Sequence, residues 1–175
     1  MIIIKSKILL TLTILYFGIA FSQTKADSLE IENINKYSET INENSKIAEY
    51  QFEVKSKNKI VKYQYSKKGN EIVEITREWK VDNGDYIDTY IDYFLLKNEE
   101  RVYVNQSIVF KKKSDEEIIG GWSCTFWIKK DKVIHMTSLG HGKTELPDWD
   151  YEKELKENFN YMMKQVQKVE KNKNK

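Results

Sequence analysis

Hydrophobic side chains recur at every second position through the middle of the chain, from about residue 47 to residue 140. Tyr50, Phe52 and Val54 begin this pattern, and it returns in six later segments. A repeat of two is typical of a β-strand with one buried face, because successive side chains of a strand point to opposite faces. The pattern predicts seven strands, over residues 47–56, 59–66, 71–81, 86–96, 101–111, 118–128 and 133–140.

Short groups of turn-forming residues separate the predicted strands. The strongest of them contains Asn83-Gly84, because both residues tolerate the positive φ of a tight hairpin turn. Connections this short force neighbouring strands to run antiparallel, since a parallel return needs a crossover of about a dozen residues. The six turns fall at Ser56 to Asn58, Lys67 to Asn70, Asp82 to Asp85, Lys97 to Glu100, Lys113 to Glu116 and Lys129 to Lys132.

Two helices are predicted to flank the strands. In the first, residues 26–45, Ile34, Tyr37 and Ile41 lie at helical spacing among polar residues. The second follows Pro147, with Asp148 as its N-cap, and its apolar seam consists of Leu155, Phe159, Met162, Val166 and Val169. The sequence therefore predicts an α+β fold, a seven-stranded antiparallel meander on which an N-terminal helix and a longer C-terminal helix pack.

The first 22 residues have the features of a secretory signal peptide. Lys5 and Lys7 precede an apolar run from Ile8 to Phe21, and the small residues Ala20 and Ser22 suit cleavage before Gln23. A membrane anchor is the alternative, but a spanning helix needs about 20 apolar residues and this run is shorter. No cysteine follows the run, so the lipid-anchored variant is excluded. We expect a periplasmic or secreted protein, with residues 23–175 forming one domain and a frayed, lysine-rich tail from about residue 168.

Charge and cysteine content exclude further classes of protein. Removal of residues 1–22 takes two lysines from the 29 basic residues and leaves 27, which balance the 27 acidic residues. A nucleic-acid binder would show a clustered basic excess, so nucleic acid is not expected as a partner. The single cysteine excludes a disulfide framework within the monomer.

The string from Gly140 to Thr144 contains the Gly-Lys-Thr that ends a phosphate-binding loop. The full motif needs a small residue where Thr137 stands, and it needs a helix to begin at the lysine, where Glu145-Leu146-Pro147 follows. The string therefore does not predict nucleotide binding, and the sequence indicates no cofactor. A glycine-rich exit from the last strand explains it better.

Cys124 and His135 are candidates for a nucleophile pair or for metal ligands. If Lys130-Asp131 forms a two-residue turn, the two side chains are diagonal neighbours on one sheet face, about 7 to 8 Å apart at Cα. A shift of register by one residue would place them on opposite faces. The apolar neighbours of Cys124 favour a buried thiol, and the spacing of His135 and His141 matches no known zinc motif.

The fourth predicted strand brings acids and aromatic residues to one face. Asp88 and Asp92 share it with Tyr86, Tyr90 and Phe94. The opposite face holds Ile87, Ile91 and Leu95, so we expect that side to be the core and the acids to be solvated, not a catalytic pair in a cleft.

Tyrosine-rich surfaces offer rigid contact area with a polar end, which suits binding of a protein or a glycan. We therefore predict a binding surface on the aromatic sheet face. The alternative, that each helix covers one sheet face, remains open. The predicted surface consists of Tyr86, Tyr90 and Phe94 with Tyr63, Tyr65 and Tyr103 from nearby strands.

A unit of aromatic strand end, lysine-containing turn and apolar restart recurs about every thirty residues, as in Tyr63-Gln64-Tyr65 before Lys67 and Ile72-Val73. Together with Phe21-Ser22-Gln23 and the Lys/Ile/Asn-rich composition, this pattern resembles the small exported β-meander proteins of the Bacteroidota. The resemblance implies export and a sheet, and it implies no activity.

The leading functional hypothesis is an exported, non-enzymatic binding module that recognises a protein or an extracellular ligand through the aromatic sheet face. One alternative is a carrier of an apolar ligand inside a curled sheet. A third is a hydrolase that uses Cys124 and His135.

We expect the exported protein to begin at Gln23, because Ala20 and Ser22 satisfy the small-residue preference of a signal peptidase. The intact mass of the protein recovered from the periplasm or the culture medium measures this. Recovery of a membrane-bound protein that retains residues 1–22 would contradict it.

Overall fold

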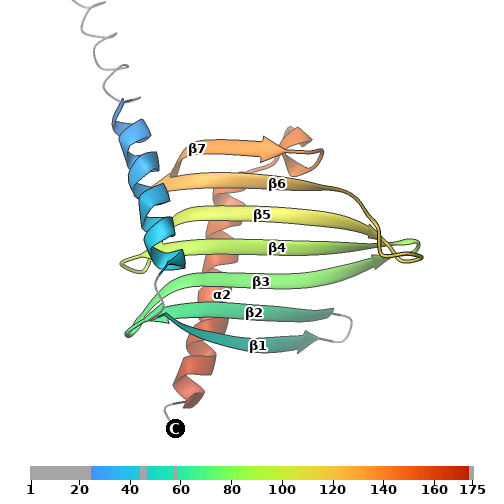
Figure 1. Cartoon of the computed structure of the whole chain (residues 1–175), viewed down its shortest axis with the longest axis horizontal. Helices are drawn as coiled ribbons and strands as arrows, with labels where there is room; N and C mark the ends of the chain where they lie inside the picture. The colour runs from blue at the N-terminus through green and yellow to red at the C-terminus, as the bar shows by residue number, and fades with distance from the viewer. Residues whose placement is uncertain (1–24, 44–46, 57–58, 174–175) are drawn as a thin grey trace, which may run out of the picture.

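The computed structural model describes residues 25–43, 47–56 and 59–173, so the predicted signal peptide lies outside the described residues. Figure 1 shows a single twisted sheet with one helix on each face. The sheet has seven antiparallel strands in the order of the chain, which confirms the predicted meander. The strands are β1 (Ala48–Ser56), β2 (Lys59–Lys68), β3 (Glu71–Asn83), β4 (Tyr86–Lys97), β5 (Glu100–Lys112), β6 (Ile118–Lys129) and β7 (Lys132–Leu139).

Tight turns at one end of the sheet join β4 to β5 and β6 to β7. Asn98 and Glu99 have φ of 53° and 65°, and Lys130 and Asp131 have φ of 49° and 64°. Two positive-φ residues in a two-residue loop give the backbone twist that matches the right-handed twist of the flanking strands. Lys130-Asp131 therefore forms the two-residue turn that was considered from the sequence.

The C-terminal helix α2 (Tyr151–Lys173) lies across one face of the sheet (Figure 1). Its buried residues are Leu155, Met162 and Val166, three members of the predicted seam. Asp150, and not the predicted Asp148, caps the helix: its Oδ1 accepts a hydrogen bond from the Lys153 amide at 3.0 Å. The helix begins two residues later than the position of Pro147 indicated.

The end of α2 is held to the sheet and is not the frayed tail that the sequence predicted. The Glu170 carboxylate accepts hydrogen bonds from Lys67, at 2.5 Å, and from Tyr65. These bonds lower the pKa of Glu170 to about 2. The Lys173 ammonium lies 3.7 Å from the centroid of the Tyr50 ring. These contacts order the helix through Lys173 because they give its charged side chains partners on β1 and β2.

The N-terminal helix, described over residues 25–42, packs on the opposite face of the sheet from α2 (Figure 1). Ile41 forms a small buried cluster with Val73 and Leu95. The Tyr37 hydroxyl donates a hydrogen bond to the Leu96 carbonyl at 2.8 Å, and the Trp127 indole donates one to Asn35 at 2.8 Å. These contacts hold the helix against β3, β4 and β6, so both faces of the sheet are partly covered.

The main core lies between α2 and the sheet. Even-numbered residues of β4 point toward α2, so Phe94 is fully buried and Asp92 is 4% exposed. The expectation that Asp92 lies on a solvated face is therefore wrong. The buried residues of this core are Tyr63, Tyr65, Ile75, Phe94, Leu96, Val104, Trp122, Cys124, Phe126, Ile128, Leu155, Met162 and Val166.

The segment between β7 and α2 crosses very close to β6, and its glycines make that crossing possible. Gly140 has a φ of 81°, and a Cβ added there would lie 2.2 Å from the Gly121 carbonyl oxygen. A Cβ on Gly142 would lie 2.4 Å from the Trp122 ring. The glycine-rich exit predicted from the sequence is thus used for close packing.

We expect Gly140→Ala to lower the free energy of unfolding much more than Gly69→Ala. Both glycines have positive φ, which costs an L-residue about 1–2 kcal/mol, but Gly69 has open space around it. At Gly140 the clash with backbone adds about 1–3 kcal/mol. Urea denaturation of the two variants measures the difference, and equal losses would contradict the close crossing.

Candidate functional site

Most of the aromatic residues predicted to form a binding surface belong to the core. Phe94, Tyr63 and Tyr65 are at most 2% exposed because they lie beneath α2. Tyr103 lies on the opposite face, half-buried and in edge contact with Tyr93 and Trp127. The predicted continuous aromatic surface is therefore wrong: the apolar seam of α2 needs an apolar sheet face, and these residues supply it. The alternative, with one helix on each face, is the arrangement that the structure has.

Tyr86 and Tyr90 remain accessible, beyond the region that α2 covers. The Tyr90 ring stacks on Trp79 of β3, with centroids 5.0 Å apart and ring planes 7° from parallel. The Lys59 ammonium lies 4.0 Å from the centroid of the Trp79 ring. Trp79 and Tyr90 are half-buried and Tyr86 is 41% exposed. We call these four residues, Lys59, Trp79, Tyr86 and Tyr90, the aromatic strip.

Sequence reasoning missed Trp79 and Lys59, although a signal for Trp79 was present. The turn at Gly84 fixes the register of β3 and β4, and that register pairs Trp79 directly with Tyr90. Directly paired residues have Cβ atoms about 4.5–5.5 Å apart, which brings two rings into contact. Lys59 reaches Trp79 from β2, and the pairing of β2 with β3 depends on a register shift at Ser66/Lys67 that no sequence pattern indicates.

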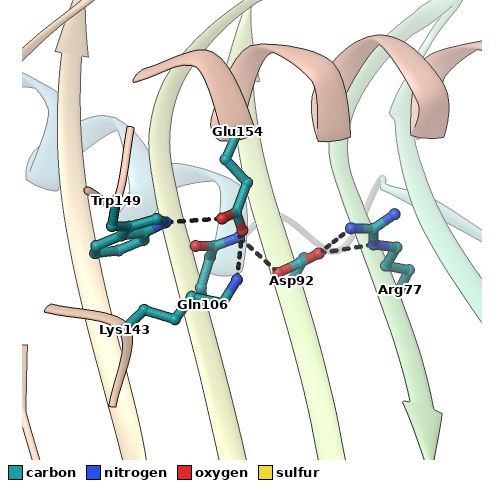
Figure 2. Close-up of polar contacts among 6 residues, drawn as sticks. All are labelled: Arg77, Asp92, Gln106, Lys143, Trp149 and Glu154. Carbon is teal, nitrogen blue, oxygen red and sulfur yellow. Dashed lines mark hydrogen bonds and ion pairs between the residues drawn. The ribbon is translucent and has the colours of Figure 1, made fainter. Parts of the chain in front are cut away.

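A buried polar network lies beside the strip, between the sheet and the start of α2 (Figure 2). Arg77 of β3 binds one oxygen of Asp92 through Nε, at 2.7 Å, and through Nη2, at 2.6 Å. Gln106 of β5 donates to the other oxygen of Asp92 at 3.0 Å and to Glu154 of α2 at 3.2 Å. The register places these groups side by side, since Asp92 pairs with both Arg77 and Gln106.

Glu154 connects this network to the segment that precedes α2. It accepts hydrogen bonds from the Trp149 indole, at 2.7 Å, and from Lys143 (Figure 2). Burial opposes ionisation of Glu154, but the hydrogen bond from Lys143 and then that from Trp149 hold its pKa below the usual value. Two carboxylates and two cations balance, so the network is neutral overall.

The network orients the start of α2, and it leaves one hydrogen-bonding position open. Gln106 is 2% exposed, yet its Oε1 atom has no partner among the described residues. Both protons of its amide nitrogen point at carboxylates, which fixes the orientation of the amide. The arrangement can hold charge and donate hydrogen bonds, and it presents no activated nucleophile.

The predicted Cys124–His135 pair does not form. A register shift between Trp127 and Ile128 pairs Cys124 with Ser138 and His135 with Trp127. The two side chains therefore lie on opposite faces of the sheet. Cys124 is fully buried, and burial raises the pKa of its thiol to about 11. The hydrolase hypothesis loses its nucleophile, because the thiolate is the reactive form.

Several surface clefts have mixed polar linings. One of about 460 Å³ lies over β1 to β3, and one of about 530 Å³ surrounds the segment from Leu146 to Glu157. Neither has the aliphatic lining that a carrier of an apolar ligand needs, so they give that hypothesis no support. Among the described residues there is no group of three or more His, Cys, Asp or Glu side chains that could hold a metal ion. No described helix is long and apolar enough to cross a membrane.

Comparisons of the chain with protein-family models, with curated proteins and with solved structures found no match. The resemblance to small exported β-meander proteins therefore stays a prediction from the sequence pattern.

We expect Asp92→Asn to destabilise the protein strongly, because it leaves the buried Arg77 guanidinium without its counter-charge. Breaking a buried ion pair in this way costs about 3–5 kcal/mol. Asp88 lies four residues away on the same face and is only half-buried, so Asp88→Asn is a matched control that costs at most about 1 kcal/mol. Chemical denaturation measures both, and similar stabilities would show that the network is dispensable.

Proposed function

We propose that this protein is an exported, non-enzymatic binding module and that its partner, another protein, docks on the aromatic strip. The observation that supports this most is the stack of Lys59, Trp79 and Tyr90, which stays partly accessible on the sheet face that α2 packs against. Protein interfaces are enriched in Trp and Tyr at their centre, and these residues supply most of the binding energy.

The shape of the strip favours a protein over a small molecule. Small-molecule sites are concave, whereas Trp79 and Tyr90 line neither of the two larger clefts. Tyr86, at the end of the strip, borders a smaller cleft of about 400 Å³ between the β3–β4 and β5–β6 turns. Polar and charged side chains surround the strip, among them the half-buried Asp88 and the exposed pair of Lys113 with Asp82. An aromatic centre with a polar rim is the usual composition of an interface between separately folded proteins.

The strip is also ordered before any partner arrives. Stacking holds the Trp79 and Tyr90 rings against each other, and the Lys59 ammonium and the Arg77 guanidinium also lie over the Trp79 ring. Beside them the Arg77–Asp92 pair fixes the neighbouring positions of β3 and β4. Side chains that are already immobilised lose less conformational entropy on binding, which favours affinity.

We expect Trp79→Ala and Tyr90→Ala to weaken binding of the partner at least about tenfold, as truncation of a central aromatic residue usually does. The immobilised protein would first capture its partner from the periplasm or medium of its own host. Calorimetry with the purified partner would then compare the variants. Tyr161→Ala is the control, because Tyr161 is an exposed tyrosine of α2 outside the strip.

Partner binding that is unchanged in both strip variants would refute the strip as the interface. Native mass spectrometry of the exported protein adds a second test. A bound glycan or apolar molecule in place of a protein would overturn the proposal, and circular dichroism checks that each variant is folded.

A further inference from the structure

Arginine is rare in this chain, and the side chains of both arginines are largely shielded from solvent. The sequence has two arginines, Arg77 and Arg101, against 27 lysines. Each lies on the α2 side of the sheet and pairs with a carboxylate, and the side chains are 13% and 4% exposed. A buried guanidinium has five N–H donors to satisfy, so the partners of each nitrogen decide what the site can do.

Arg101 is only partly satisfied. Its Nε and Nη2 both donate to Oδ1 of Asp131, at 3.0 and 2.6 Å. Its Nη1 is closed off from solvent and has no partner among the described residues. A buried, charged donor without a partner costs more free energy than a neutral one. An acceptor supplied from outside the chain would therefore bind favourably to this nitrogen.

Asp131 cannot neutralise its surroundings alone. Its second oxygen binds Lys156 of α2 at 3.0 Å, so one carboxylate serves two cations. Hydrogen bonds from Lys156 and Arg101 hold the pKa of Asp131 below its usual value, against the opposing effect of burial. The three groups together keep one positive charge.

A cleft of about 410 Å³ opens at this position. It lies between the β4–β5 turn and the β6–β7 turn, whose positive-φ residues hold both turns in tight conformations. The ring of Phe159, which packs on Phe94 with centroids 5.7 Å apart, forms an apolar part of its wall. The residues that line the cleft are Glu99, Glu100, Arg101, Lys130, Asp131 and Phe159.

We infer that this cleft binds a carboxylate carried on an apolar body, with Arg101 Nη1 donating to the carboxylate and Phe159 contacting the apolar part. With Glu99, Glu100 and Lys130 included, the charges around the cleft sum to zero, so the carboxylate is held by its charge-assisted hydrogen bond with Nη1 and not by a net positive charge. Glu99 and Glu100 in the lining disfavour an anion with more charge, such as sulfate or phosphate. Because Nη1 is closed off without a ligand, binding requires side chains of the lining to move, and Glu100 and Lys130 are exposed and long enough to do so.

A titration of the ¹⁵N-labelled exported protein with 3-phenylpropionate, monitored by NMR, tests the site. Each arginine gives one Nε–Hε signal, so Arg101 is the reporter and Arg77 is an internal control in the same spectrum. We expect a saturable shift of the Arg101 signal with a Kd of about 1 mM, which suits a ligand of this size. The neutral 3-phenylpropanamide and sulfate should leave the signal in place.

Arg101→Lys keeps the charge but removes the planar fork, and it should weaken binding at least about tenfold, as followed by ligand-observed NMR. An unchanged Arg77 signal shows that this variant is folded, and the titration of the unmodified protein does not depend on it. Absence of a saturable shift, equal shifts with the amide, or an equal response to sulfate would each overturn the inference. The cleft and the aromatic strip share no residue, so the two proposals are tested separately: Arg101→Lys weakens carboxylate binding, and loss of binding at the strip depends on Trp79 and Tyr90.

Discussion

The structure depends on the burial of one seam of α2 against the middle of the sheet. Leu155, Met162 and Val166 are fully buried there, against strand residues that include Phe94 and Phe126. A seven-stranded open sheet has an apolar face that must be removed from water, and a single long helix is the smallest element that can cover it. The cost is that aromatic side chains under the helix are withdrawn from any surface role.

Polar groups that fall within the covered region have to be satisfied in place. Asp92 and Gln106 lie on the same face as the apolar core, and they are tolerated because Arg77 and Glu154 complete their hydrogen bonds (Figure 2). Arg101 plays the same part nearer the turns, with Asp131 and Lys156. The covered face is therefore an apolar core bordered by two clusters of hydrogen-bonded charged side chains. Each cluster has one buried atom without a partner among the described residues, Gln106 Oε1 in the first and Arg101 Nη1 in the second.

Much of the fold could be predicted from the sequence. The alternation from Tyr50 onward gave the strands, the turn groups gave the antiparallel order, and the spacing of Leu155, Met162 and Val166 gave the buried seam of the C-terminal helix. The candidate site was harder to predict from the sequence, because both faces of β4 carry apolar side chains. Ile87, Ile91 and Leu95 alternate with acids and aromatic residues, so periodicity alone could not say which set meets the longer helix.

The sequence by itself determined the meander, since the period of two and the short turns are local properties that neighbouring residues settle. The tertiary structure decided which residues are surface and which are core. A register shift at Trp127/Ile128 moved His135 to the face opposite Cys124, and the docking of α2 turned Phe94 and Tyr65 inward while leaving Trp79 and Tyr90 accessible. These outcomes depend on bulges and on contacts between segments far apart in the chain. A one-residue shift exchanges the two faces of a strand, and no local pattern encodes it.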